Sequence, residues 1–245
     1  MKKRQPYSIL AKYYDDFAGA KRYKEWHSFL KEIIKKYKID SDFAIDLACG
    51  TGTNSETLKN LGFAQVFGVD KSQAMLDQAK IKHKNISFFK KDFLNFYGKR
   101  FKEASLVTCF YDSLNYLLEE SELEKAFINV YKSLKNGGVF VFDLNTPEHV
   151  KGIAGNKPAL FTNGDLSVRL ESSCRDDFWF LDLSISTKDK DDIFKERHIE
   201  KAYSEKVVKI LIKRSGLKLL DIKREQKKYQ DGKYYNNRIY YIVKK

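Results

Sequence analysis

The stretch Ala44-Ile-Asp-Leu-Ala-Cys-Gly-Thr-Gly-Thr-Asn54 decides the fold, because a short apolar run here leads into an acid and then into a Gly-x-Gly turn. This pattern is typical of a strand that passes into a helix beside a bound nucleoside. A second apolar run, Val66-Phe-Gly-Val-Asp70, also ends in an acid. The two acids at two strand ends predict a nucleoside site in a doubly wound α/β sheet.

Apolar runs and helical periods alternate outward from this stretch. They predict an open, Rossmann-like sheet that begins with five parallel strands joined by crossover helices. Two further strands are expected to complete the sheet, and the last of the seven is expected to be antiparallel. The strands are expected at 43–47, 66–69, 86–89, 106–110, 139–142, 217–222 and 239–243, with a turn at 230–233 before the last. The helices between them are expected at 54–61, 72–80, 120–134 and 204–213.

Two segments stand apart from this alternation. In residues 9–38 the apolar residues have helical spacing, which is interrupted at Gly19. In contrast, residues 166–172 and 178–186 alternate between apolar and polar with period two, on either side of a turn at 175–177. Residues 193–202 could add a third such strand. We therefore expect an N-terminal helical cap at 1–38, a core formed by 39–150 and 204–245, and a small antiparallel β-rich lid insertion at 151–203.

Composition favours one globular, water-soluble unit. The chain has 245 residues, of which 42% are hydrophobic and only three are proline. No apolar run reaches the roughly 18 residues of a membrane span, and the start Met1–Arg4 does not lead into a signal-peptide core. A cytoplasmic location is expected. Three cysteines far apart and four histidines without ligand spacing predict neither a disulfide framework nor a metal.

The net charge of +13 would attract RNA if the charge were clustered. Nine of the 46 basic residues are Arg, and the Lys residues are scattered among Asp and Glu. Because phosphate recognition relies on Arg forks, this dispersal is more typical of a solvated face. RNA remains the less favoured partner.

The residue types in the first loop argue against a dinucleotide. Asp46 lies just inside the strand end, where its charge repels a pyrophosphate and attracts an ammonium or sulfonium group. Ser55 occupies the position at which the NAD fingerprint has its third glycine. Gly50 and Gly52 could alternatively form a tight turn that binds nothing.

Two later acids complete the expected nucleoside site. Asp70 can accept hydrogen bonds from both ribose hydroxyls, with Lys71 and Met75 beside the adenine; alternatively, it is an acid at a helix N-terminus. Asp92 can accept from the adenine amino group while Phe93 stacks on the base, although a surface-loop acid is the other interpretation.

Five motifs now occur in a recognisable order. They are Asp46–Gly52, Gly68-Val-Asp70 with 72–75, Lys91-Asp92-Phe93, Cys109–Tyr116 and Lys135-Asn-Gly-Gly-Val139. In combination they resemble class I S-adenosylmethionine-dependent methyltransferases over most of residues 40–145. Ala48 stands where that family has its first loop glycine. The resemblance implies S-adenosylmethionine as cofactor, with Asp46 near its methionine amino group. The implied cofactor-binding residues are Tyr14, Asp46, Ala48, Gly50, Thr51, Gly52, Asp70, Lys71, Met75, Asp92, Phe93 and Phe110.

The acceptor side is implied by the same resemblance. Its expected residues are Tyr13, Asn115, Tyr116, Arg169 and Trp179. An amine acceptor need only be bound neutral, whereas a hydroxyl acceptor needs a base, for which Asp112 or His149 could serve. Asp112 is alternatively a turn residue and His149 a surface residue, and the cap tyrosines could simply pack.

Within the family the chain is most similar to small bacterial enzymes with a β-rich insertion, such as glycine or sarcosine and amino-sugar N-methyltransferases. It lacks the Asn/Asp-Pro-Pro-aromatic motif of DNA and protein amide methyltransferases. We expect methyl transfer to a small-molecule amine or hydroxyl by in-line displacement. The alternatives are an RNA methyltransferase and a non-catalytic cofactor-binding interaction protein. Both a monomer and a homodimer remain open.

Overall fold

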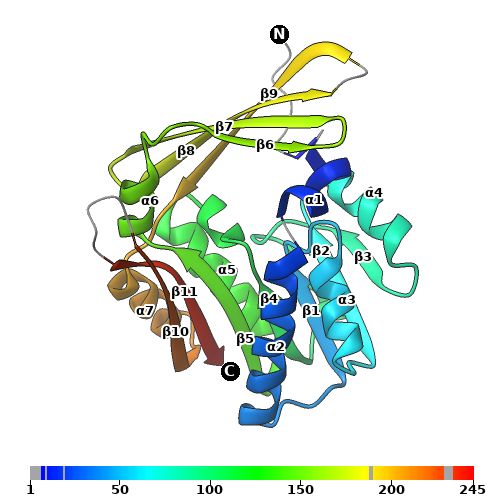
Figure 1. Cartoon of the computed structure of the whole chain (residues 1–245). Helices are drawn as coiled ribbons and strands as arrows, with labels where there is room; N and C mark the ends of the chain where they lie inside the picture. The colour runs from blue at the N-terminus through cyan, green and yellow to red at the C-terminus, as the bar shows by residue number, and fades with distance from the viewer. Residues whose placement is uncertain (1–6, 9, 19, 188–189, 229–233) are drawn as a thin grey trace.

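The structure, a computed structural model, describes residues 7–8, 10–18, 20–187, 190–228 and 234–245. These residues form a seven-stranded main sheet and a separate four-stranded second sheet (Figure 1). The strands of the main sheet are β1 Phe43–Leu47, β2 Gln65–Asp70, β3 Ser87–Lys90, β4 Ala104–Cys109, β5 Leu134–Asn145, β10 Lys218–Lys228 and β11 Tyr234–Lys244. The turn expected at 230–233 lies outside the described residues.

The main sheet has the order β10-β11-β5-β4-β1-β2-β3. Strands β1 to β5 pair in parallel, and β11 is antiparallel to both of its neighbours, β5 and β10. The predicted seven-stranded, Rossmann-like sheet with an antiparallel last strand is thus confirmed. The strand order changes direction between β1 and β4, and at such a point the carboxyl ends of parallel strands leave a crevice for a ligand.

Helices cover both faces of the main sheet (Figure 1). On one face α5 and α7 bury Phe127 and Leu211 against strand residues such as Phe140, and on the other α2 and α3 bury Trp26 and Leu58. The helix bounds are α1 Tyr14–Ala18, α2 Ala20–Tyr37, α3 Thr53–Asn60, α4 Gln73–Lys82, α5 Glu120–Ser133, α6 Pro147–Ile153 and α7 Glu205–Arg214, with 3-10 turns η1 Leu10–Tyr13, η2 Lys99–Phe101 and η3 Ser113–Tyr116.

Capping side chains explain where several helices begin. Ser72 accepts a hydrogen bond from the Met75 backbone N–H at 3.3 Å, and Ser204 and Thr146 cap α7 and α6 in the same way. Such caps satisfy backbone donors that have no partner within the first turn. The cap at Ser72 places the start of α4 directly after the acid that ends β2.

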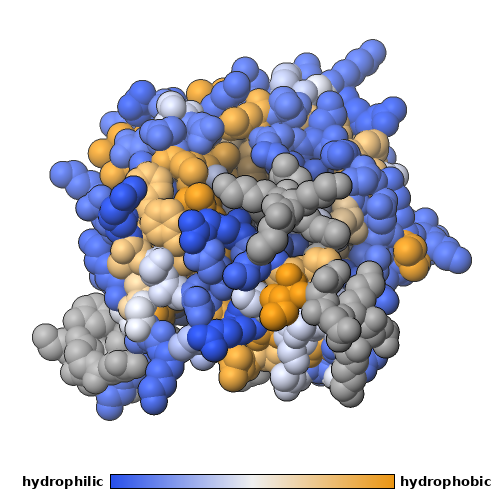
Figure 2. Space-filling model, turned by 90° about the horizontal axis from the view of Figure 1, so that it is seen from above, coloured by the Kyte–Doolittle hydropathy of each residue, from blue (hydrophilic) through white to orange (hydrophobic). Residues whose placement is uncertain are grey.

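The second sheet consists of β6 Ala159–Asn163, β7 Leu166–Arg175, β8 Phe178–Thr187 and β9 Lys190–Lys201, all antiparallel. It lies across the top of the molecule, on the side of the carboxyl ends of β1, β2 and β4 (Figure 1). Seen from this side, the surface is mainly hydrophilic with hydrophobic residues between (Figure 2). Strand β6 was not predicted, because its residues are mostly exposed and do not alternate.

The N-terminal residues divide their contacts between the two sheets. Leu10 of η1 is buried in a cluster with residues of the second sheet, Leu166, Val168, Leu183 and Ile185. In contrast, α2 packs on the main sheet. Two other boundaries differ from expectation, since α5 ends at Ser133 and β5 already begins at Leu134. Among the described residues, no helix has the length and apolar character needed to cross a membrane.

Candidate active site

A cavity of about 780 Å³ lies at the carboxyl ends of β1, β2 and β4. This volume is within the usual range for small-molecule sites. Its walls come from the loops after these three strands, from residues 90–93 after β3, and from N-terminal residues between Tyr7 and Trp26. The cavity therefore occupies the crevice that the strand order creates.

The loop after β1 has an unusual backbone. Ala48, Gly50 and Gly52 all adopt left-handed conformations, with φ values of +54°, +55° and +87°. A Cβ added to Gly50 would meet no atom within 4 Å, whereas one added to Gly52 would lie 2.8 Å from His83 and Phe88. Gly50 thus leaves open space at the cavity wall, and Gly52 permits close packing away from it.

Asp46 lines the cavity, but both oxygens of its carboxylate accept hydrogen bonds from other side chains of the protein. Its Oδ1 accepts hydrogen bonds from Asn54 Nδ2 at 2.7 Å and Thr108 Oγ1 at 2.9 Å, and its Oδ2 accepts from Ser55 Oγ at 2.7 Å. Burial raises the pKa of Asp46 to about 6, although these bonds favour its charged form. The carboxylate therefore ties β1 to β4 and to the start of α3.

Asp70 ends β2 and borders the cavity. It accepts hydrogen bonds from the backbone N–H groups of Gly50 at 2.9 Å and Ser72 at 2.7 Å. Burial raises its pKa, whereas these backbone bonds oppose the shift. Its position joins the Gly50 loop to the start of α4, with Met75 beside it on the cavity wall.

Asp92 and Phe93 line the same end of the cavity after β3. Asp92 accepts from the Leu94 backbone N–H at 3.0 Å, and its Oδ2 lies 3.0 Å from Lys71 Nζ. Residues from the ends of three strands are thus brought together here. We call this region the carboxylate end of the cavity.

A second set of cavity-wall residues is aromatic. Successive rings contact one another at centroid distances between 4.6 and 6.3 Å. Phe110 stacks on the Trp26 ring at 4.8 Å. We use the name aromatic end for a set of six residues that line the cavity, Tyr7, Tyr14, Tyr23, Trp26, Tyr111 and Tyr116.

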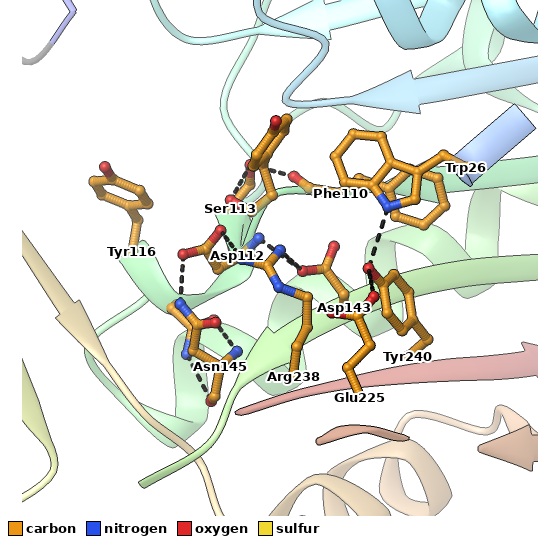
Figure 3. Close-up of polar contacts among 12 residues, drawn as sticks. Trp26, Phe110, Asp112, Ser113, Tyr116, Asp143, Asn145, Glu225, Arg238 and Tyr240 are labelled. Atoms are coloured by element: carbon orange, nitrogen blue, oxygen red, sulfur yellow. Dashed lines mark hydrogen bonds and ion pairs between the residues drawn. The ribbon is translucent and has the colours of Figure 1, made fainter. Parts of the chain in front are cut away.

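The loop after β4 is held in a strained conformation. Tyr111 and Asp112 have left-handed φ values of +60° and +48°, which non-glycine residues rarely adopt. The Asp112 backbone N–H donates to Asp143 Oδ2 at 3.0 Å, and its carboxylate accepts from Asn145 Nδ2 at 2.5 Å. Arg238 pairs with both Asp112 and Asp143 (Figure 3). This buried network fixes the loop that carries Tyr111.

The network removes Asp112 from the cavity wall, because its carboxylate faces Arg238 and Asn145 instead. Burial raises the pKa of Asp143 to about 6, with Arg238 opposing the shift. The pKa of Glu200, on β9, is also raised, first by burial and then by the charge of Asp112. Asp112 therefore anchors the loop after β4, as its interpretation as a turn residue predicts, and it is not among the residues that line the cavity.

His149 and Trp179 lie together outside the cavity walls. Their ring centroids are 5.7 Å apart, and Trp179 Nε1 donates to Ser172 Oγ at 2.7 Å. This contact packs α6 against the second sheet. Arg169 is exposed on β7 and binds Glu171 at 2.7 Å. The structure thus separates these expected acceptor and base residues from the site.

Three further expected residues also lie away from the cavity. Asn115 is buried and joins η3 to β5 and β9, donating to the Lys201 carbonyl oxygen at 2.7 Å. Tyr13 packs against the Leu10 cluster of the second sheet. Thr51 donates its hydroxyl to Asp15. Each of these side chains holds a segment next to the cavity but does not itself line the cavity.

A chain of hydrogen bonds leads from the aromatic end into the second sheet. The hydroxyls of Tyr7 and Tyr116 are 2.7 Å apart, and Tyr116 Oη lies 2.7 Å from His198 Nδ1. His198 Nε2 in turn lies 3.5 Å from Glu196 Oε2, an ion-pair distance that is long for a hydrogen bond. Glu196 also accepts from the Tyr7 backbone N–H at 2.8 Å.

Sequence reasoning missed Tyr7, Tyr23, Tyr111 and His198. The period-two pattern of β9 could have placed His198 on one face with Glu196 and Glu200, but such a polar face usually predicts solvent contact. Within the described part of the chain, no cluster of three metal-ligating side chains is found.

Comparison with known proteins agrees with this geometry. A family model described as "Methyltransferase domain" matches residues 44–138, the segment from β1 to β5. A candidate methyltransferase of Geobacillus sp. (strain WCH70) is 35% identical over 173 residues, which cover 69% of this chain and 68% of that protein.

Solved structures extend the similarity to the whole chain. An S-adenosylmethionine-dependent methyltransferase from Clostridium acetobutylicum has a TM-score of 0.82 and 30% identity, and the match covers 98% of this chain and 99% of that one. An amino pentose methyltransferase from Micromonospora echinaspora, solved with S-adenosylmethionine bound, has a TM-score of 0.74 over 100% and 99% of the two chains. At 16% identity, this second likeness concerns the fold alone.

Proposed function

The chain belongs to the class I S-adenosylmethionine-dependent methyltransferases, and we propose that it methylates a small-molecule amine that binds at the aromatic end of the cavity. The observation that carries this proposal is that one cavity is lined both by the carboxylates of Asp70 and Asp92 and by the six rings of the aromatic end. Such a lining suits two ligands of different chemistry, placed in contact.

The carboxylate end suits the cofactor. In our proposal Asp70 binds the ribose hydroxyls, and Asp92 binds the adenine amino group beside Phe93 and Met75. The open space at Gly50 supports a close approach of the ligand to the loop. Asp46 serves by holding the loop, since its oxygens already accept three hydrogen bonds.

S-adenosylmethionine supplies an electrophilic methyl group on a sulfonium. In an in-line displacement the acceptor nitrogen bonds to the methyl carbon while the electron pair of the breaking bond stays on sulfur. The protein contributes alignment, which can supply several kcal/mol of the barrier reduction. Tyr111 and Phe110, held by the loop after β4, are the residues that we propose to set this alignment.

A small acceptor fits better than RNA because the rings of the aromatic end are buried or half-buried around one cavity. Four of the rings come from the N-terminal segment, and the Tyr7 backbone is bonded to the second sheet through Glu196. We propose that this sheet acts as a lid. A cavity walled by rings favours a compact ligand, whereas RNA recognition needs an accessible, Arg-rich face.

The test of the cofactor site is calorimetric titration of wild-type protein and Asp70→Ala with S-adenosylmethionine, S-adenosylhomocysteine and NAD. We expect wild type to bind the first two and not NAD, and Asp70→Ala to lose about 100-fold in affinity, because a buried carboxylate with ribose partners is removed. Asp77→Ala, on the exposed side of α4, is the matched control and should bind normally. Normal affinity in Asp70→Ala, with an unchanged melting temperature, would contradict the proposed ribose site.

A further inference from the structure

We propose that the acceptor enters the aromatic end as an alkylammonium ion, and that Tyr7, Tyr116 and His198 carry its proton away before methyl transfer. This inference rests on the proposed function, because it assumes that the acceptor binds beside the cofactor. It goes further by naming the charge state of the acceptor and the route of its proton.

The arrangement of the rings is the first argument. Tyr111 contacts Trp26 at 4.6 Å, Tyr23 at 6.0 Å and Tyr14 at 6.3 Å, mainly edge to face. Tyr7 continues the wall from Tyr14, at 5.6 Å. A cavity walled by several aromatic rings attracts cations through their electron-rich faces, most strongly where water is excluded.

The charges around these rings are the second argument. Burial raises the pKa of Tyr116, and the charges of Glu200 and Asp112 add to the shift, so carboxylates act on this end of the cavity. Arg238 approaches the Tyr111 ring at 6.0 Å, but it is paired with Asp112 and Asp143. The aromatic end is therefore electrostatically favourable to a cation, although the chain as a whole carries +13.

The basic side chains that line the cavity lie elsewhere. Among the described residues they are Lys71, Lys90 and Lys91, which belong to the carboxylate end, where Lys71 pairs with Asp92. An acceptor phosphate at the aromatic end would thus face rings, without a basic side chain among the described residues of the cavity wall there to bind it. This distribution favours an alkylammonium over a phosphorylated acceptor.

The hydrogen-bond chain gives the proton a route. The hydroxyls of Tyr7 and Tyr116 are 2.7 Å apart, and the second lies 2.7 Å from His198 Nδ1. Burial raises the pKa of both tyrosines, so their hydroxyls stay protonated and can pass a proton without ionising. His198 is 3% exposed, and Glu196 is near its other ring nitrogen.

The step balances as follows. The ammonium gives a proton to Tyr7 Oη, the Tyr7 proton moves to Tyr116 Oη, and the Tyr116 proton moves to His198 Nδ1. The resulting imidazolium is stabilised by the Glu196 carboxylate. The freed nitrogen lone pair then bonds to the methyl carbon, and sulfur keeps the electron pair of the broken bond. The products are a methylated ammonium, a neutral thioether and a protonated His198.

The cation site can be tested without knowing the natural acceptor. Protein saturated with S-adenosylhomocysteine, which lacks the sulfonium, is titrated with tetramethylammonium, ethylammonium and choline, with 3,3-dimethylbutan-1-ol as the uncharged analogue of choline, and with inorganic phosphate. We expect at least one cation to bind about tenfold more tightly than the uncharged analogue, and no binding of phosphate. Binding of none of the cations, or equal affinity for choline and its analogue, would overturn the site.

Variants identify the residues responsible. Tyr14→Leu should weaken cation binding about tenfold, because it keeps apolar volume but removes a ring. Tyr13→Leu is the matched control, since Tyr13 is adjacent in sequence but lies outside the cavity walls. Retained affinity for S-adenosylhomocysteine shows that both variants are folded and that the proposed cofactor site is intact. If the rings serve the sulfonium alone, Tyr14→Leu changes binding of S-adenosylmethionine and no cation binds beside S-adenosylhomocysteine.

The proton route is tested by substitution along the chain of hydrogen bonds. Tetramethylammonium has no proton to lose, so a change in its affinity reports on the protein. His198 is faced by Glu196 and Glu200 on its own strand, and by Tyr7 and Tyr116. We expect His198→Gln and Tyr116→Phe, which keep the rings of the cavity wall, to bind tetramethylammonium within about twofold of wild type, because this ion needs no proton route.

His27→Gln, on α2, is the control and should turn over amines at the wild-type rate. An unchanged kcat in His198→Gln would overturn the role of His198. For any amine that the enzyme turns over, His198→Gln and Tyr116→Phe should lower kcat more than they raise KM, because they act on proton removal and not on binding. Equal changes in KM alone would also contradict the route.

Discussion

At the scale of single residues, the main result is that the acids at the strand ends differ in their hydrogen-bond partners within the protein. Asp46 accepts three side-chain hydrogen bonds, whereas Asp70, at the cavity wall, accepts from the backbone N–H groups of Gly50 and Ser72. Both positions could be predicted from the apolar runs that precede them. The partners of Asp46 could not, because Thr108 is 62 positions away and is brought near only by the pairing of β1 with β4.

The buried state of Asp46 predicts a pH-dependent stability. Its pKa is raised from 3.8 to about 6, so the folded protein binds more protons than the unfolded chain between these values. The stability due to Asp46 is therefore fully present below the unfolded pKa and is lost as pH rises through 6. Between about pH 4.5 and pH 7.5 the loss is about 2 kcal/mol.

The measurement is urea unfolding of wild type and Asp46→Asn at both pH values. Wild type should lose about 2 kcal/mol more than the variant between the lower and the higher pH, because only wild type has the titrating group. Parallel pH profiles for the two proteins would show that Asp46 has an ordinary pKa.

The two loop glycines predict separable defects. Gly52→Ala places a Cβ against His83 and Phe88 in a left-handed backbone, so it should lower the free energy of unfolding by about 1 to 3 kcal/mol. Gly50→Ala has open space and should cost only about 1 kcal/mol, but it should weaken S-adenosylmethionine binding, because its methyl group enters the cavity. Thermal unfolding and calorimetry check the pair; equal losses of affinity with equal losses of stability would contradict the distinction.

At the scale of secondary-structure elements, periodicity predicted the main sheet well, and it predicted exposed and polar elements poorly. Strand β6 lacks an alternating pattern, and β9 buries Glu196, His198 and Glu200 on a face that would ordinarily be solvated. Burial of such a face requires partners, and those partners come from Tyr7 and Tyr116, which are distant in sequence. A pattern within one strand contains no information about them.

The contact between η1 and the second sheet predicts a local change in stability. Leu10 is 1% exposed among Leu166 and Ile185, so Leu10→Ala should destabilise this docking by about 2 to 4 kcal/mol. Because α2 packs separately on the main sheet, amide exchange should accelerate in residues 10–18 and in β7 while β1 and β4 stay protected. Leu160→Ala, at a side chain that is 75% exposed, should leave exchange unchanged. Uniform acceleration across the chain would show that the two sheets unfold together.

At the scale of the whole molecule, the cavity joins regions that the sequence keeps far apart. The carboxylate end was predictable because its residues follow consecutive strands of a familiar sheet. The aromatic end was not, since it combines N-terminal residues, the loop after β4 and η3, and the Tyr7 backbone N–H donates to Glu196, which is 189 positions away. Trp179, Arg169 and His149 do not line the cavity, because the alternation of a strand shows which residues share a face but not what packs against that face.

The most direct test of the central proposal is transfer of an isotopically labelled methyl group from S-adenosylmethionine to three classes of acceptor offered separately. These are primary and secondary alkylamines, alcohols and phenols of matched size, and total RNA. The aromatic end and its surrounding carboxylates predict that label accumulates in the amines and not in the RNA. Label in RNA, or in alcohols and phenols alone, would contradict the proposal that the cavity holds a small amine for methylation.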